Sequence, residues 1–273
     1  MGLQRAVVAA ATASISGFPT WGSDVGGYAA PPEDDTELFV RWAQLGAISP
    51  LLEVGGVGPN ATPWVLGPAA MAGLRDAAVL HYELFPYLYG LLQQRQPVLR
   101  PLAWGYPDDA HAWGSRYELL VGPDLVAAPV VGQGTTPTVY LPPGSWVDLY
   151  TGETVKGGGV PFTRTTPLSQ FPLYVRSGAV VPFNLRTARR SWWAEDELTH
   201  AGRAGFLATD GTSLDLQGQP HDVQLFVPDA VPPTDVKLGG RSVPWSWNDG
   251  PLPGVVARLH GPTVQGTITL DPK

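Results

Sequence analysis

Three side chains able to take part in chemistry lie in two glycine-rich stretches near the start of the sequence. Asp24 and Tyr28 lie in "GFPTWGSDVGGY" (residues 17–28), and Glu53 lies in "SPLLEVGG" (residues 49–56). Because glycine has no side chain, a carboxylate among glycines leaves room for a backbone or a ligand to approach it closely. We therefore treat these three residues as candidate ligand-binding residues, with capping of the next turn as the alternative role for Asp24.

Other reactive residue types are few or scattered. The sequence contains no cysteine, which removes disulfides, thiolate metal sites and cysteine nucleophiles together. "VGQGTT" lacks the lysine and the following helix of a phosphate-binding loop, so we expect a turn there. Five histidines have no paired spacing on one face, and we expect hydrogen-bonding roles for them: His81, His111, His200, His221 and His260. We expect neither a metal site nor a cofactor.

The composition argues against two classes of partner. Of the 273 residues 44% are hydrophobic, which allows a sizeable core and more than one domain. The net charge is −7 and no basic cluster is longer than Arg189–Arg190, so we expect no nucleic-acid partner. No apolar run is long enough to cross a bilayer, and the N-terminus lacks the pattern of a secretion signal. We expect a soluble protein; the lack of cysteine favours the cytoplasm and is also compatible with secretion.

The first 96 residues alternate between helical and extended patterns. Residues 3–15 are expected to form a helix that Gly17 ends, and residues 18–25 a strand with its following loop. Residues 50–54 are expected to form a short buried strand, and residues 68–94 a long helix that Pro86 kinks.

The helix between the two strands has its own start signal. Asp34 followed by Glu37 resembles a capping box with aspartate in the capping place. Leu38, Trp42 and Leu45 then follow at helical spacing, which predicts one buried face.

Helices and strands that alternate over short connections indicate parallel strands with crossover helices. In such sheets, ligands bind at the loops that follow the carboxyl ends of the strands. Asp24 and Tyr28 lie in one such loop and Glu53 lies at the next strand. We therefore expect the three residues at the same edge of the sheet.

After Pro97 the pattern changes to short apolar runs separated by glycine and proline, which is typical of a β-sandwich. The charged segment "RTARRSWWAEDE" then precedes a third region with further predicted strands. Within it, Trp245 and Trp247 alternate on one face of a strand, where we expect them to pack in the core, with stacking on a sugar as the alternative.

Several segments, in order and with matching spacing, resemble glycoside hydrolase family 31, the retaining α-glucosidases, α-xylosidases and relatives. "GFPTWGSDVGGY" resembles the family's G-x-P-x-W-G-x-D-I-G-G-F, and "ELFVRWAQLGAISPLL" resembles E-L-x-x-R-W-x-Q-x-G-x-x-S-P. The resemblance covers about two-thirds of the chain, residues 1–183, and continues through "LFPYLYGLL", "PVLRPLAWGYPDD", "LLVGPDLVAAPVV", "VYLPPGSWVD" and "PLYVRSGAVVP".

The resemblance implies a fold of the α/β plus all-β class, because family members have a (β/α)8 barrel followed by two β-sandwich domains. Residues 1–96 would supply the last two β/α units of the barrel, residues 97–186 the proximal sandwich and residues 187–273 the distal β-domain. The family's nucleophile and acid/base are aspartates on the fourth and sixth barrel strands. Both are expected outside this sequence, and "SWWAEDE" (residues 191–197), which superficially resembles one of their motifs, is expected to be a solvated linker.

The resemblance also suggests roles for the three candidate residues. Asp24 matches an aspartate that lines the sugar pocket, and Tyr28 stands where the family has an apolar Phe platform, with plain packing as its alternative role. Glu53 and Gly55 depart from the family pattern S-P-L-x-R-x-H-G, because they replace its Arg and His. Two potential cations are thus exchanged for one anion, which implies either a different sugar or a decayed site.

Three hypotheses remain open from the sequence. The chain is the C-terminal portion of a retaining α-glycosidase, inactive in isolation. Alternatively, it is a non-catalytic carbohydrate-binding or scaffold protein that kept the sandwich. As a third possibility, it is one subunit of a split glycosidase that a chain with the missing barrel strands completes. The expected ligand in each case is a carbohydrate, and the sequence does not settle its identity.

Overall fold

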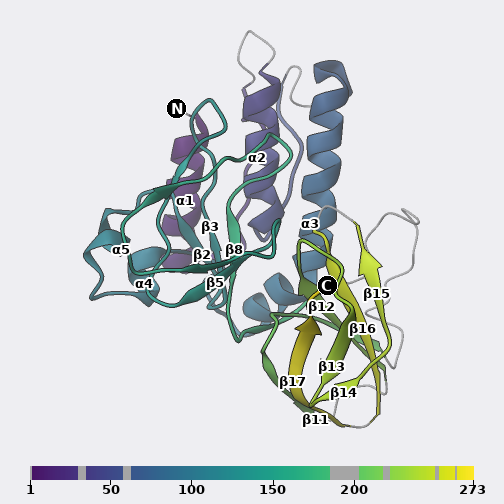
Figure 1. The fold of residues 1–273 in the computed structure, drawn as a ribbon. Coiled ribbons are helices and arrows are strands. Elements are labelled where there is room, and N and C mark those ends of the chain that lie inside the picture. The colour runs from purple at the N-terminus through teal and green to yellow at the C-terminus, as the bar shows by residue number, and fades with distance from the viewer. Residues whose placement is uncertain are drawn as a thin grey trace. The chain divides into compact units, whose positions relative to one another are not determined.

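The computed structural model describes residues 2–29, 35–57, 63–184, 203–217, 222–249, 252–261 and 263–273. The chain divides into two compact units. The first contains Met1–Tyr82, Leu88–Gly144 and Lys156–Leu173, and the second contains Glu83–Tyr87, Ser145–Val155 and Tyr174–Lys273. Each unit is described by itself below, with the elements labelled as in Figure 1.

Helices dominate the beginning of the chain. They are α1 (Gly2–Ile15), α2 (Thr36–Ile48), the 3-10 turn η2 (Pro63–Leu66) and α3 (Pro68–Gln93). The ends of α1 and α3 lie within one residue of the predicted ones, and Gly17 beyond α1 has a φ of 91°, a left-handed conformation that favours glycine. Pro86 lies inside α3, and the kink expected there stays a prediction.

The start of α2 differs from the prediction. The N-cap is Asp35, whose side chain accepts a hydrogen bond from the backbone N–H of Leu38 at 2.8 Å, while Asp34 lies outside the described residues. Two adjacent aspartates offer the same capping chemistry, so the sequence pattern was ambiguous by one position. The helix is also buried on more than the one face predicted, because every residue from Phe39 to Ile48 is buried.

The two predicted strands near the start are not regular strands. Residues 18–25 and 50–54 share one isolated parallel bridge, between Asp24 and Glu53, and the prediction of a buried second strand was wrong because Leu51 is 46% exposed. A strand forms its ladder with neighbours on its two edges. Residues 18–25 also bond elsewhere, since the N–H of Phe18 donates to the carbonyl of Ala13 and the hydroxyl of Ser23 accepts from Trp42, and the few bonds described between the two segments do not form a continuous ladder.

The remainder of the first unit contains short antiparallel strands. β1 (Leu99–Pro101), β2 (Leu119–Val121) and β3 (Leu125–Ala127) follow one another as antiparallel neighbours, and two small helices, α4 (Leu102–Gly105) and α5 (Ala110–Gly114), lie between β1 and β2 in the chain. β4 (Thr138–Val139) pairs with β7 (Phe162–Thr163). Nearly every side chain of β1 to β3 is buried, as the apolar runs in the sequence indicated.

The second unit is made almost entirely of strands. β5 (Ser145–Asp148) lies between β8 (Leu173–Arg176) and β6 (Thr154–Lys156). A five-stranded sheet has the order β15-β16-β12-β10-β9, from Trp245–Asn248, Gly254–His260, Asp222–Pro228, Arg203–Ala208 and Val180–Pro182. A four-stranded sheet has the order β11-β17-β13-β14, from Ser213–Gln217, Thr263–Asp271, Asp235–Leu238 and Arg241–Ser242. Only β10 and β12 pair in parallel among the pairs described here.

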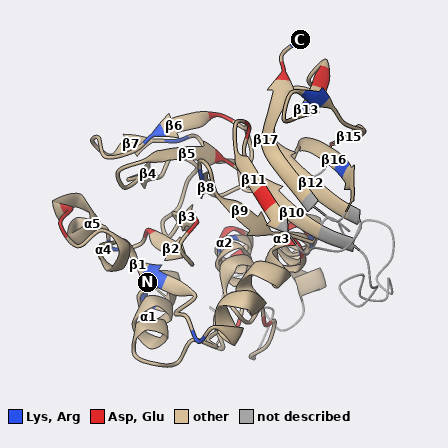
Figure 2. Cartoon of the chain, turned by 90° about the horizontal axis from the view of Figure 1, so that it is seen from below, with Lys and Arg blue, Asp and Glu red and all other residues tan. Residues whose placement is uncertain are grey.

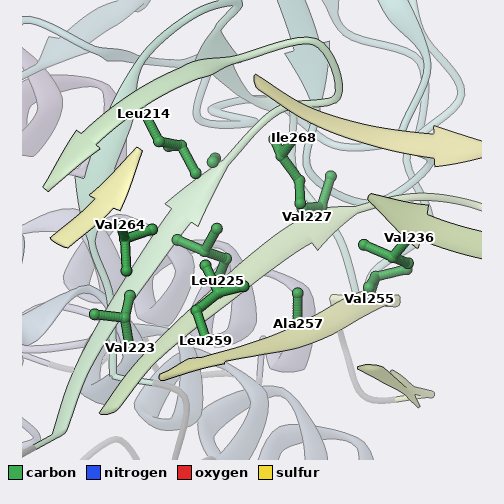
Figure 3. Packing of buried hydrophobic residues seen from close by; sticks show 11 residues of the cluster. Leu214, Val223, Leu225, Val227, Val236, Val255, Ala257, Leu259, Val264 and Ile268 are labelled. Carbon is green, nitrogen blue, oxygen red and sulfur yellow. The ribbon is translucent and has the colours of Figure 1, made fainter. Parts of the chain in front are cut away.

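One apolar core joins these two sheets. Figure 3 shows Val227 of β12 beside Ile268 of β17, and Val223 of β12 beside Val264 of β17, so side chains of both sheets meet in this core. The side chains of β12 that contribute alternate along the strand, as expected when one face of a strand is buried. Trp245 and Trp247 pack against this cluster, which confirms the predicted core role for both.

A buried arginine on α2 holds together segments of the first unit that are far apart in the sequence. The side chain of Arg41 is 2% exposed, and its Nη1 donates to the carbonyl of Gln170 at 2.6 Å while its Nη2 donates to that of Thr166 at 3.1 Å. Longer bonds reach the carbonyls of Pro167 and Gly134, both at 3.4 Å. A buried guanidinium needs such partners because the loss of its hydration is costly.

Gln44, one turn further along α2, extends this arrangement. Its Nε2 donates to the carbonyls of Leu168 at 2.7 Å and Gln170 at 3.2 Å, and its Oε1 accepts from Arg41 at 3.2 Å. Glu37, one turn before Arg41, accepts the backbone N–H of Gly134 at 3.0 Å. We call Glu37, Arg41 and Gln44 the α2 clamp, because together they bind the loops around residue 134 and residues 166–170.

Replacement of Arg41 by alanine is expected to destabilise the first unit strongly. The change removes the Arg41 donors from the buried carbonyl of Thr166 and the partly buried carbonyl of Gln170, and each unsatisfied group costs about 1–3 kcal/mol, so a loss of roughly 3–5 kcal/mol is expected. Urea unfolding followed by tryptophan fluorescence measures it. Arg75→Ala, at an exposed position of α3, is the matched control and is expected to change the free energy of unfolding by about 0.5 kcal/mol or less. Equal stability of the two variants would contradict the role of the clamp.

Candidate functional site

The two glycine-rich stretches that carry the candidate residues lie side by side in parallel. The backbone N–H of Leu51 donates to the carbonyl of Trp21 at 3.3 Å, that of Val25 to Glu53 at 2.9 Å, and that of Val57 to Tyr28 at 2.7 Å. Parallel bridges join Asp24 with Glu53 and Ala29 with Val57. The sequence argument from parallel strands predicted that these two stretches lie next to each other. We call residues 21–29 and 51–57 the parallel pair.

Glycine is required where the parallel pair is closest. A Cβ atom at Gly22 would lie 2.6 Å from the Cβ of Leu51, and a Cβ at Gly56 would lie 2.4 Å from the carbonyl oxygen of Tyr28. Gly56 also has a φ of 105°, which side chains rarely allow. Any larger residue at these positions would therefore push the two segments apart.

Asp24 and Glu53 are direct neighbours in the pair, and their carboxylates lie near the same point. A Cβ at Gly55 would lie 2.6 Å from Asp24 Oδ1 and 3.8 Å from Glu53 Oε1. The space that a side chain at position 55 would need is thus taken by the carboxylate of Asp24. Asp24 is half-buried and Glu53 is exposed. Two ionised carboxylates only accept hydrogen bonds, so this point favours a ligand that donates them.

Trp42 of α2 supports the loop that carries Asp24. Its side chain is 7% exposed, and its Nε1 donates to the Oγ of Ser23 at 2.8 Å. A Cβ at Gly27 would meet the ring of Trp42 at 3.4 Å, so the loop lies directly on the indole. The carbonyl of Asp24 accepts the N–H of Gly27 at 2.9 Å, which closes the turn after the aspartate. The position of Asp24 is therefore fixed by a buried aromatic residue and a tight turn.

Tyr28 lies at the same end of the pair, with 66% of its side chain exposed. Its main chain contacts Gly56 closely and bonds Val57. The structure thus brings Asp24, Tyr28 and Glu53 to neighbouring positions of two adjacent segments. Their roles in binding a ligand stay predictions.

Other candidates are located away from this pair or outside the described residues. His81 is mostly buried, with its Nδ1 3.2 Å from the carbonyl of Ala47, and burial lowers its pKa while hydrogen bonds to the carbonyls of Ala47 and Gly46 oppose the shift. No group of three or more potential metal ligands was found among the residues that the structure describes. Residues 191–197, "SWWAEDE", and His200 and His221 lie outside the described residues.

Figure 2 shows Lys and Arg scattered over the elements of the described chain. Among the described residues, no helix is long and apolar enough to cross a membrane.

The α2 clamp and Ser23 were not identified from the sequence. Arg41 and Gln44 were quoted only as part of a motif, although a charged residue between Val40 and Trp42 in an apolar run is a signal of a buried hydrogen-bonding role. Their partners could not be found in this way, because the hydrogen bonds of Arg41 reach residues 93 to 129 positions away.

Comparison with known proteins matches both parts of the chain to one family. Residues 1–91 match the glycosyl hydrolases family 31 TIM-barrel domain, and residues 95–181 match the glycosyl hydrolase family 31 C-terminal domain. The chain belongs to glycosyl hydrolase family 31. This result confirms the resemblance found from the sequence motifs.

Individual relatives cover most of this family 31 chain but are much longer themselves. The alpha-xylosidase of Saccharolobus solfataricus is 32% identical over 220 residues, which is 75% of this chain and 29% of the relative. A sulfoquinovosidase from E. rectale is 32% identical with a TM-score of 0.57, over 63% of this chain and 27% of that one. The chain spans less than a third of the length of either relative.

A third relative shows the fold over almost the whole chain. The cycloalternan-forming enzyme from Listeria monocytogenes has a TM-score of 0.78 and 18% identity, over 98% of this chain and 31% of that one. The match includes the strands beyond residue 181, where the family models end.

Replacement of Gly56 by alanine is expected to separate the parallel pair. The methyl group would meet the carbonyl of Tyr28, and the positive φ alone costs about 1–2 kcal/mol, so we expect a loss of about 2 kcal/mol or more. Gly90→Ala in α3 is the control, because a Cβ there meets nothing within 4 Å and helical alanine is favoured. Thermal unfolding compares the melting temperatures of the two variants. Hydrogen exchange of the Val57 amide reports whether its bond to the Tyr28 carbonyl is kept. An unchanged melting temperature with Val57 still protected would refute the close packing.

Proposed function

We propose that residues 1–273 are the C-terminal part of a retaining α-glycosidase that hydrolyses O-glycosyl bonds in carbohydrate metabolism. The observation that supports it most is the parallel pair, which presents Asp24 beside Glu53 in a region matched by the family 31 barrel model. The nucleophile and the acid/base aspartate are proposed to lie outside these residues. They would act through a covalent glycosyl–aspartate intermediate, the route of retaining glycosidases.

The proposed architecture follows from this assignment. Residues 1–96 would form the last two β/α units of a (β/α)8 barrel, residues 97–186 the proximal β-sandwich and residues 187–273 the distal β-domain. Two parallel segments with three helices do not close a barrel, which needs eight strands. The proposal therefore requires further barrel strands, either on the same polypeptide or on a partner chain.

The roles of the three candidate residues are proposed from their positions. The half-buried carboxylate of Asp24 would accept hydrogen bonds from sugar hydroxyls, and the exposed ring of Tyr28 would cover one face of the sugar. Glu53 would add a second acceptor. Gly55 has no side chain that could contact a ligand, and the carboxylate of Asp24 occupies the space where one would lie. The site would therefore differ from family members with a histidine at this position.

Exposed apolar side chains in the first unit support the proposal that further barrel strands pack against it. Phe18, three residues before the parallel pair, is 69% exposed, Val57 at its end is 62% exposed, and Trp64 in η2 is 66% exposed. Large apolar side chains that are this exposed can mark a contact with other protein. We infer that further barrel strands cover them. The cytoplasm is the compartment that we propose for the complete enzyme.

We propose as a second candidate function a carbohydrate-binding or scaffold protein without catalysis. It is favoured by the second unit, whose two sheets share a complete apolar core of their own. Under this proposal the chain binds a sugar but never hydrolyses it, even with the barrel strands supplied.

Activity measurements distinguish these proposals. The chain alone is expected to release no p-nitrophenol from aryl α-glucosides or α-xylosides, because both catalytic aspartates are absent, and loss of such groups lowers the rate by orders of magnitude. Co-expression with a chain that carries the upstream barrel strands is expected to restore hydrolysis. In that complex, Asp24→Asn is expected to lower kcat/KM about 10- to 100-fold, the effect of a hydrogen bond to a charged group.

Asp215→Asn, at an exposed position of β11, is the control and is expected to leave kcat/KM unchanged. Hydrolysis by the chain alone that Asp24→Asn abolishes would contradict the proposed absence of the catalytic pair. A soluble complex that binds sugar without turnover would instead support the non-catalytic function.

A further inference from the structure

A small cavity lies in the first unit, among residues 117–138, which are far along the chain from the parallel pair. Its volume is about 240 Å³. It is lined by residues just before β2, residues just after β3 and the segment that leads into β4, which together are Tyr117, Glu118, residues 128–134 and residues 136–138. The cavity thus has three walls from neighbouring stretches of one compact unit.

The lining combines apolar walls with a few polar groups. Tyr117, Pro129 and Val130 supply apolar surface, while Glu118, Thr136 and Thr138 supply a carboxyl and two hydroxyl groups. The described residues that line the cavity include no Lys or Arg, so an anionic ligand would find no opposite charge there. The lining therefore offers apolar and polar surface in similar amounts, which suits a small ligand that has both.

Among the described residues that line the cavity, Glu118 is the only acidic one. Its environment favours a ligand that donates hydrogen bonds. Burial raises the pKa of its carboxyl group, although backbone N–H groups of Glu118, Tyr140 and Tyr117 oppose the shift. Burial therefore leaves the carboxylate less well solvated than in water, and a hydroxyl donor from a ligand would stabilise it.

The wall formed by residues 132–138 is held from both sides. Glu37 of α2 accepts the N–H of Gly134 at 3.0 Å, so the α2 clamp fixes one end. On the other side, the N–H of Thr166 donates to the carbonyl of Thr135 at 2.6 Å, and the N–H of Arg164 donates to that of Pro137 at 3.1 Å. A wall that is already fixed loses little conformational entropy when a ligand binds.

We propose that this cavity is a second carbohydrate site, which holds one neutral sugar ring. A hexopyranose has an apolar face suited to Tyr117 and Val130, and hydroxyl groups at its edge that can donate to Glu118 and exchange hydrogen bonds with Thr136 and Thr138. The small volume admits a single ring rather than a chain of rings. The inference goes beyond the proposed hydrolysis and does not depend on it.

Titration of the full ¹⁵N-labelled chain with methyl α-D-glucopyranoside tests the proposal. Amide shifts are expected at Ala128, Val131, Gly132 and Gln133. Glu118→Gln keeps the shape of the side chain but removes its charge, and it is expected to weaken binding at this site at least tenfold. Glucuronic acid, whose own carboxylate would be repelled by Glu118, is expected to bind at least tenfold more weakly than the neutral glycoside.

Glu153→Gln, in the exposed turn between β5 and β6, is the matched control and is expected to leave the affinity unchanged. Tyr117→Ala is a second variant that tests the apolar wall. No shifts at the four cavity amides, or shifts that survive both Glu118→Gln and Tyr117→Ala, would overturn the proposal. Shifts confined to the amides of Val25 and Gly55 would also overturn it, while leaving the proposed glycosidase site in place.

Discussion

Arg41 places a cation in the interior of the first unit, and main-chain carbonyl groups surround it. Such a group cannot lose its partners without a large penalty, so the loops that carry Gly134, Thr166 and Gln170 must remain where they are. The adjacent residue Trp42 lies under the glycine-rich loop and bonds Ser23. Residues 41 and 42 of α2 therefore fix both the loop that carries Asp24 and the loops that carry Gly134, Thr166 and Gln170.

Local signals in the sequence were sufficient for the long helices α1, α2 and α3 but not for the short helices α4 and α5 or for the two strands near the start. The long helix from Pro68 was found from the spacing of its apolar residues, which is a property of the segment itself. Whether residues 18–25 and 50–54 form ladders depends instead on neighbouring strands, which sequence propensity does not describe. For this reason their proximity was predicted correctly while their regularity was not.

The candidate site shows the same division. The rule for parallel strands brought Asp24 and Glu53 together, and the bridge between them agrees. The contact of the Asp24 carboxylate with Gly55 could not be predicted, because it depends on a side-chain direction set by the turn at Gly27. The main-chain carbonyl partners of Arg41 lie more than 90 positions away, so their identity required the folded chain.

β17 has a consequence for the order in which the second unit folds during synthesis. It pairs with β11 through Thr263–Thr267 and with β13 through Ile268–Asp271, so it is the central strand of its sheet. β11 is therefore translated well before the strand that must receive it, and its apolar residue Leu214 stays uncovered for that time. Chains stalled on the ribosome before residue 263 would expose this edge to chaperones or to aggregation, much as α2 must wait for residues 134–170 before Arg41 has its carbonyl partners.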